Sequence, residues 1–216
     1  MKENFRYQIK INIEALLATW MLGVGWTFML LISNDFFSDV NLGTHFYHFA
    51  SGCMAGVSLV THSIVDAYFL QLSITFGNSR KQWFAVSVIY KIIYSIILSL
   101  SILFLAFLVS QIIKEQSLTI QGKDVLFSFI IILLFLFIGD IAGAFISRFG
   151  AIKFCFILGG VLGVVVGVGY TTRDKIGRLY EDILSRPVLT GLVATVIFIP
   201  LIFIFWRLIR KQEVKI

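Results

Sequence analysis

The chain has 216 residues, of which 58% are hydrophobic and 14% charged, and its formal net charge is +6. Its mean hydropathy is +0.93. Soluble domains usually carry about 25% charged residues, so this composition excludes an ordinary soluble domain and indicates one integral membrane domain, residues 1–216. In a membrane protein the excess of Lys and Arg collects at the cytoplasmic ends of spans, and we therefore expect no nucleic-acid partner.

The apolar segments predict an all-α protein with six transmembrane helices, since a helix needs about 20 apolar residues to cross the hydrocarbon. Upstream of the first span, Phe5, Ile9, Ile13 and Leu16 recur at helical spacing. This pattern predicts an N-terminal amphipathic helix on the membrane surface that leads into the first span. The predicted spans cover residues 15–33, 46–72, 85–113, 125–147, 152–170 and 187–208.

The distribution of Lys and Arg predicts the orientation. If the N-terminus is inside, most of the 18 Lys and Arg residues fall on inner segments, and the first outer loop, residues 34–45, has none. Both termini are therefore predicted to be cytoplasmic. The polar loop between the second and third spans then faces the cytosol.

That loop, "SITFGNSRKQWFAV", is a cationic and aromatic island between two apolar runs. Its cations and its Trp are accounted for by membrane topology alone. Alternatively, the glycine breaks one helix, Asn and Ser cap a short transverse helix with a polar face, and the aromatic pair pins that helix to the membrane. The residues concerned are Gly77, Asn78, Ser79, Arg80, Lys81, Gln82, Trp83 and Phe84.

The stretch "LSITFGNSRKQWFAVSVIYKII" resembles the loop between the second and third spans of ABC-2-type transporter permeases. In that family a Gly–x–Ser–Arg–Lys segment followed by aromatic residues belongs to the region that contacts the ATPase. The resemblance implies a multi-pass subunit of a bacterial exporter in the cell (plasma) membrane. Permeases of comparable size export peptides, lipids or antimicrobials, as those for the phenol-soluble modulins do.

The same resemblance implies the partners. The chain has no G-x-x-x-x-G-K-[ST] loop for phosphates, so we expect no cofactor in this chain, and ATP and Mg²⁺ to be bound by separate ABC ATPase subunits. Six spans are half of the usual complement, so a second permease chain, identical or homologous, is expected to pair with it. The substrate is expected to be amphipathic or lipophilic, and the other partner is membrane lipid.

Three charged residues lie inside predicted spans: Asp66, Lys91 and Asp140. Each is about seven residues from a cytosolic span end, or roughly 10 Å at 1.5 Å per residue. An unpaired charge there costs at least about 2.5 kcal/mol. We therefore predict that Lys91 pairs with Asp140, Asp66 or both; snorkelling of Lys91 to the interface is the alternative.

Small and polar residues mark two further helix faces. His48, Ser51, Ser58 and His62 form a stripe on the second span, which either lines a transport pathway or packs against a neighbouring helix. No third ligand accompanies His62 and Asp66, so no metal site is expected. Gly159, Gly163 and Gly167 recur every four residues, which predicts close helix packing.

Motifs for other functions are incomplete or absent in the sequence. The residues before Asp140 read "LFIGD" and lack the first glycine of the Gly-x-Gly-Asp motif of intramembrane aspartyl proteases, and no hydrolase motif is present. The chain itself is therefore not expected to be an enzyme. The alternatives that remain are a six-span substrate-capturing subunit of a vitamin importer and a non-transporting membrane sensor or immunity protein.

Overall fold

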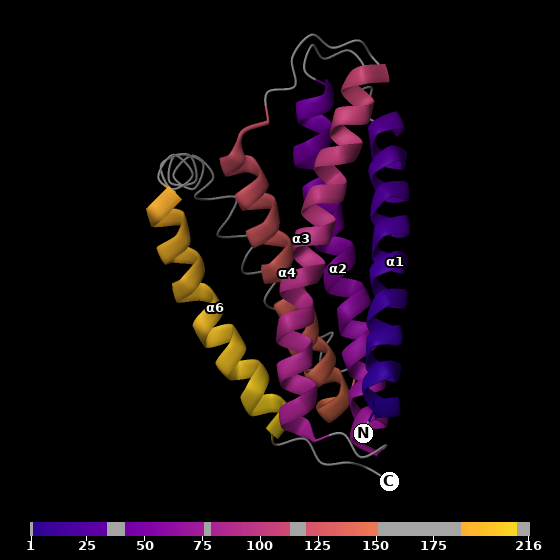
Figure 1. Ribbon diagram of the computed structural model, residues 1–216, viewed down its shortest axis with the longest axis vertical. Helices are drawn as coiled ribbons and strands as arrows, with labels where there is room; N and C mark the ends of the chain where they lie inside the picture. The colour runs from indigo at the N-terminus through magenta and orange to yellow at the C-terminus, as the bar shows by residue number, and fades with distance from the viewer. Residues whose placement is uncertain (1, 34–41, 76–78, 113–119, 151–186, 211–216) are drawn as a thin grey trace.

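The computed structural model describes residues 2–33, 42–75, 79–112, 120–150 and 187–210. This part of the chain is entirely helical and contains no strand, which confirms the predicted all-α class. The predicted fifth span and Gly159, Gly163 and Gly167 lie outside the described residues. The helices are α1 (Lys2–Ser33), α2 (Leu42–Thr75), α3 (Arg80–Ile112), α4 (Gly122–Phe149) and α6 (Pro187–Arg210) (Figure 1).

Three of these helices are long and apolar enough to cross a membrane. Arg80–Gln111, Gly122–Phe149 and Leu192–Arg210 have mean hydropathies of 2.7, 2.8 and 2.5 in their apolar windows. A shorter apolar stretch, Ile13–Met29, lies in α1. Helices of this length and hydropathy can cross the hydrocarbon core while their backbone groups hydrogen-bond within the helix. These helices therefore indicate a membrane protein.

The helix boundaries follow from local chemistry. α1 runs unbroken from Lys2 to Ser33, so the N-terminal segment extends the first span and is not a separate helix. At the start of α4 the Gln121 backbone N–H donates to Asp124 Oδ2 at 2.8 Å. α4 ends at Gly150, whose φ of +90° suits glycine and whose N–H donates to the Ile146 carbonyl at 2.8 Å.

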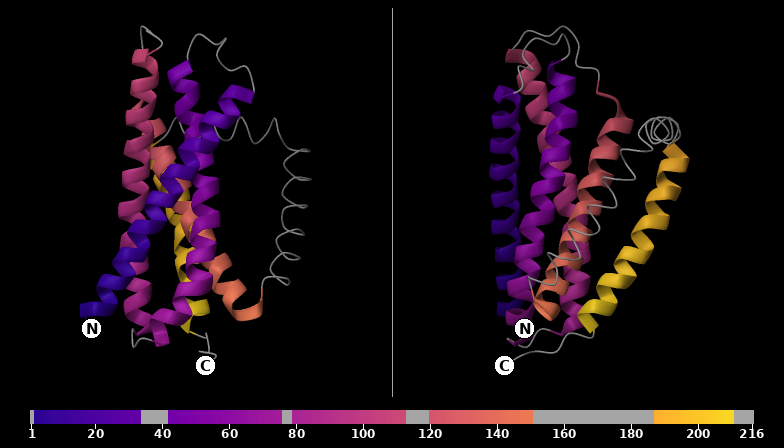
Figure 2. Two further views of the ribbon diagram at one scale, coloured as in Figure 1. Left: turned by 90° about the vertical axis from the view of Figure 1, so that its right-hand side faces the viewer. Right: turned by 180° about the vertical axis from the view of Figure 1, so that it is seen from behind.

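The helices form a bundle in which α1 and α6 lie on opposite sides (Figure 1). α1 contacts α2 and α3, whereas α6 contacts α4 and α3. α1 and α3 run in one direction and α2, α4 and α6 in the other (Figures 1 and 2). The start of α3 and the ends of α4 and α6 therefore lie at the same end of the bundle as the start of α1.

α2 and α4 pack as parallel neighbours in a fixed register. Three hydrogen bonds join them, and each links residues 77 or 78 positions apart: Tyr47 with Asp124, Ser51 with Ser128, and His62 with Asp140. A constant offset is what two parallel helices in register produce. The helices approach each other closely at Gly139, where an added Cβ would lie 2.7 Å from the Leu59 carbonyl oxygen. Glycine at this position therefore permits the contact.

Candidate functional site

The first turn of α3 is an ordered, capped structure. Ser79 Oγ accepts the Gln82 N–H at 3.2 Å, and Gln82 Oε1 accepts the Ser79 N–H at 3.1 Å. This reciprocal pair satisfies two of the donors that a helix start leaves open. Ser79 thus caps a helix, as the sequence predicted. Gly77 and Asn78 lie outside the described residues.

The capped helix is not the short transverse helix that was predicted. It is the beginning of α3, which continues without a break to Ile112. The prediction was wrong because nothing after Phe84 stops the helix: the following residues are mostly apolar and include no Pro or Gly, and adding residues to an existing helix is favourable. The polar residues of the island therefore lie at the end of a long, unbroken helix.

The two cations of this turn have different surroundings. Arg80 is half-buried, and its Nη1 donates to the Arg210 carbonyl oxygen in the last turn of α6 at 2.6 Å. A cation at a helix C-terminus satisfies an open carbonyl and suits the negative end of the helix dipole. Lys81 and Gln82 are exposed. Lys81 is therefore the cation of this turn that a partner could reach.

Trp83 and Phe84 do not pin α3 to the membrane surface, so that prediction was wrong for the aromatic pair. Trp83 is 3% exposed and packs with a cluster from α4 and α6 that includes Phe137 and Phe205. The Phe84 ring lies 5.1 Å from the Trp206 ring, centroid to centroid. Both rings therefore hold the start of α3 against α4 and α6.

Further along α3, a buried charge network is centred on Asp140. Its Oδ2 forms an ion pair with Lys91 Nζ and accepts the Ser87 hydroxyl at 3.1 Å. Its Oδ1 lies 3.2 Å from His62 Nδ1. Since a carboxylate oxygen only accepts, Nδ1 carries the proton that it donates. Asp140 is 0% exposed, and Lys91 and His62 are 1% and 2% exposed.

The network joins four helices. Lys91 of α3 reaches Asp140 of α4, and its Nζ lies 5.5 Å from the Phe137 ring centroid and 5.1 Å from that of Phe205 on α6. These distances are within the range of cation–π attraction. From α2, the His62 ring packs edge-on against Tyr94 of α3 at 5.1 Å between centroids. α2, α3, α4 and α6 therefore meet at one ion pair.

The predicted cluster of intramembrane charges is thus present in part. Lys91 pairs with Asp140 and does not snorkel to the helix end. Asp66 lies in α2, one turn after His62, but its side chain is outside the described residues. Sequence reasoning missed Ser87 and Tyr94, although Ser87 lies four residues before Lys91 and Tyr94 three after it. Their helical spacing from Lys91 was the signal that could have identified both residues as neighbours of this charge.

The polar stripe of α2 mainly faces α4. Ser51 Oγ donates to the Tyr47 carbonyl at 2.8 Å and accepts the Ser128 hydroxyl at 2.9 Å. His48 is exposed. Ser58 Oγ and His62 Nε2 are buried and have no hydrogen-bond partner within the described residues. Of the two interpretations of the stripe, these contacts favour helix packing, with His48 directed to the surface.

Comparison with protein-family models, curated proteins and solved structures finds no match to this chain. Within the described residues, no third His, Cys, Asp or Glu joins His62 and Asp140 to form a group that could hold a metal ion. Chemically, the network can hold helices together and place a fixed charge deep in the bundle.

Proposed function

We propose that the chain is the permease subunit of a bacterial ATP-binding-cassette exporter of the ABC-2 type. Its substrate would be an amphipathic peptide, a lipid or an antimicrobial compound, carried out across the cell membrane. A separate ATPase subunit supplies ATP and Mg²⁺ and docks at residues 77–84. The observation that carries the proposal is the capped first turn of α3, which offers Lys81 to a partner while Arg80, Trp83 and Phe84 fix it to α6 and α4.

The same arrangement supports a route for coupling. Lys91 lies 11 residues after Arg80 on one unbroken helix, a distance of about 16 Å at 1.5 Å per residue. A force on the first turn of α3 therefore moves the helix as a rigid body, and Lys91 moves with it. Because Lys91 is paired with Asp140 and touches α6, the other helices follow the motion of α3.

A complete transporter would need two copies of the permease and two ATPase subunits. Chemical crosslinking of the complex in native membranes, followed by mass measurement, tests this stoichiometry. We expect a species with two permease chains, identical or homologous. An active purified complex with one permease chain would contradict the pairing.

The docking of the ATPase is tested by Lys81→Glu. A tagged chain is purified from its native membrane in mild detergent, the co-purified proteins are identified by mass spectrometry, and ATP hydrolysis is measured in proteoliposomes. We expect an ATP-binding-cassette ATPase to co-purify with the unchanged chain and to be lost with Lys81→Glu, because the reversed charge repels the surface that Lys81 contacts.

Lys123→Glu is a matched control. Lys123 is also exposed and is also the second residue of its helix, but it lies at the other end of the bundle. We expect it to retain the ATPase and normal hydrolysis. If no ATPase co-purifies with the unchanged chain, the exporter assignment fails; if Lys81→Glu retains the ATPase and its coupled activity, the docking site is wrong.

A further inference from the structure

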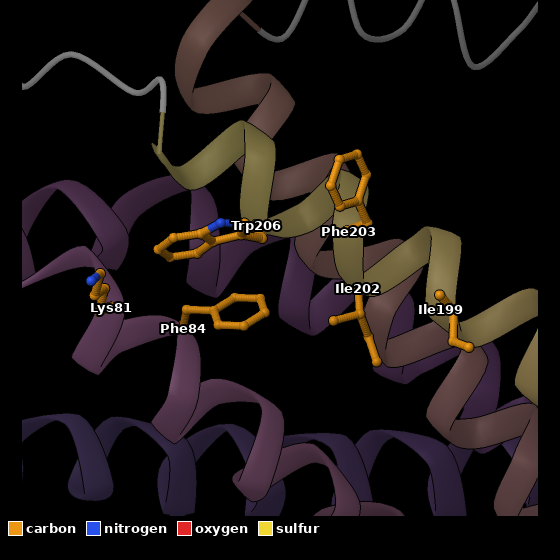
Figure 3. A pocket seen from close by; sticks show the side chains of 6 residues that line it. All are labelled: Lys81, Phe84, Ile199, Ile202, Phe203 and Trp206. Atoms are coloured by element: carbon orange, nitrogen blue, oxygen red, sulfur yellow. The ribbon is translucent and has the colours of Figure 1, made fainter.

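Two hollows lie on either side of the C-terminal half of α6 and share Phe203. The first, between α4 and α6, has a volume of about 320 Å³ and is lined by Arg148, Phe149, Phe203, Ile204, Arg207 and Leu208. The second, between α6 and the start of α3, has a volume of about 450 Å³ (Figure 3). Its walls are Lys81, Phe84, Ile199, Ile202, Phe203 and Trp206.

The first hollow carries two positive charges. Arg148 is in the last turn of α4 and Arg207 in the last turn of α6, and both side chains are exposed. Within the described residues neither guanidinium forms an ion pair. The Arg148 guanidinium carbon lies 5.0 Å from the Phe149 ring centroid. Two planar guanidinium groups beside one hollow are suited to a phosphate, which they bind through paired hydrogen bonds.

The apolar walls run from this charged end toward the middle of the membrane-spanning helix. Phe203 and Ile199 precede Arg207 by four and eight residues, which places them about 6 and 12 Å deeper along α6. Phe203 is 59% exposed and Ile199 63% exposed. A free phosphate ion would not contact these apolar side chains. A molecule with a phosphate at one end and hydrocarbon chains at the other would contact both.

We propose that this end of α6 binds an anionic phospholipid. The lipid phosphate lies between Arg148 and Arg207, and the acyl chains extend along Phe203 into the second hollow, where Lys81 adds a third cation at the edge. Basic pockets between membrane-spanning helices are known to hold acidic headgroups. The bound lipid bridges α4 and α6 near their ends. The site shares Lys81 with the proposed ATPase contact, but Arg148 and Arg207, which hold the phosphate, have no part in the exporter assignment.

The test measures lipid-dependent thermal stability of the purified full-length chain in detergent. Short-chain phosphatidylglycerol, short-chain phosphatidylcholine and inorganic phosphate are titrated separately. We expect phosphatidylglycerol to raise the unfolding temperature in a saturable manner, and the other two compounds to have little effect at the same concentrations. Equal stabilisation by phosphatidylcholine, or by inorganic phosphate, would overturn the proposal.

The double variant Arg148→Gln/Arg207→Gln identifies the site. We expect its apparent affinity for phosphatidylglycerol to fall about 30-fold, which corresponds to about 2 kcal/mol for two basic residues. Lys123→Gln, at the opposite end of the bundle, should bind as the unchanged chain does. A second double variant, Arg148→Lys/Arg207→Lys, keeps the positive charges but removes the planar guanidinium groups. It should give an intermediate loss of affinity for phosphatidylglycerol. Unchanged affinity in the Gln variant would contradict the site.

Discussion

At the scale of single residues, Asp140 is held on both of its carboxylate oxygens. It is fully buried and receives Lys91, Ser87 and His62 from two different helices. Removing one partner of a buried ion pair leaves the other charge uncompensated, whereas replacing both partners with neutral groups of similar size costs much less. The pair can therefore be tested separately for stability and for function.

We predict that Lys91→Met and Asp140→Asn each lower the free energy of unfolding by about 3–5 kcal/mol, and that the double variant recovers most of the loss. In the double variant the new amide oxygen can accept the His62 N–H, and the new amide NH₂ can donate to the Ser87 hydroxyl oxygen. Unfolding of the purified protein in mixed detergent micelles, followed by circular dichroism, measures all three. Additive losses in the double variant would show that the two residues do not act as a pair.

The double variant also separates a structural role from a coupling role. If the ion pair only fastens the helices, the stable double variant should export substrate normally. If it carries motion from α3 to α4, the double variant should be stable but should transport poorly while its ATPase still hydrolyses ATP. Because stability and transport are measured on the same protein, the two roles give different results.

Tyr94 makes a second residue-scale link, between α3 and α1. Its hydroxyl donates to the Ala15 carbonyl at 2.9 Å and lies 2.6 Å from Thr19 Oγ1. We predict that Tyr94→Phe lowers the free energy of unfolding by about 1 kcal/mol, the usual net contribution of such a hydrogen bond. Tyr90→Phe, at a half-buried neighbouring position, should change it by less than about 0.5 kcal/mol. Equal effects of the two changes in the same unfolding assay would exclude a special role for Tyr94.

At the scale of helices, the close contact of α2 with α4 depends on Gly139. An added methyl group would meet the α2 backbone at Leu59 and His62 Cβ at 3.1 Å. Because backbone cannot move aside as a flexible side chain can, we predict that Gly139→Ala costs about 1–3 kcal/mol of stability. It should also weaken the contact between His62 and Asp140, which depends on the same approach.

Gly56→Ala is the control for Gly139→Ala, because a Cβ at Gly56 would meet nothing within 4 Å. We expect Gly56→Ala to leave the unfolding transition unchanged or to raise it slightly. If both alanine variants unfold at the same denaturant concentration as the unchanged chain, α2 and α4 are not held together at Gly139 in the way that the geometry indicates.

The sequence predicted some helix features and not others for physical reasons. The apolar runs and the cap at Ser79 are local signals. The cap was predicted correctly, and within the described residues three of the predicted spans are helices long and apolar enough to cross a membrane. The burial of Trp83 and the contact of Arg80 with Arg210 depend on α6, more than 100 residues away along the chain, and no local pattern reports them. The pairing of Lys91 with Asp140 was predictable because the cost of a lone charge in a membrane forces a partner to exist.

At the scale of the whole molecule, the described cations indicate an orientation. Arg80, Lys81, Arg148, Arg207 and Arg210 all lie at the end of the bundle where α1 begins. Because Lys and Arg accumulate on the cytoplasmic side of membrane proteins, we predict that this end faces the cytosol. The predicted six-span topology with both termini inside requires the same orientation.

The orientation predicts which positions can be labelled from outside the cell. In a chain with Cys53 and Cys155 replaced by alanine, we expect Lys123→Cys to react with a membrane-impermeant maleimide on intact cells. Lys81→Cys should react only after the membrane is permeabilised. Labelling of Lys81→Cys on intact cells would reverse the assignment and would place the proposed ATPase site on the wrong side of the membrane.

The parallel pairing of α2 with α4 has a consequence for how the protein is made. The polar groups of Tyr47 and His62 find their partners on a helix 77 or 78 positions later in the chain. At about 5–20 residues per second, the ribosome needs roughly 4 to 15 s to reach them. During that interval α2 carries polar groups that lipid does not satisfy. We therefore expect nascent α2 to stay beside the translocon, or with a membrane chaperone, until α4 emerges and releases it into the bilayer.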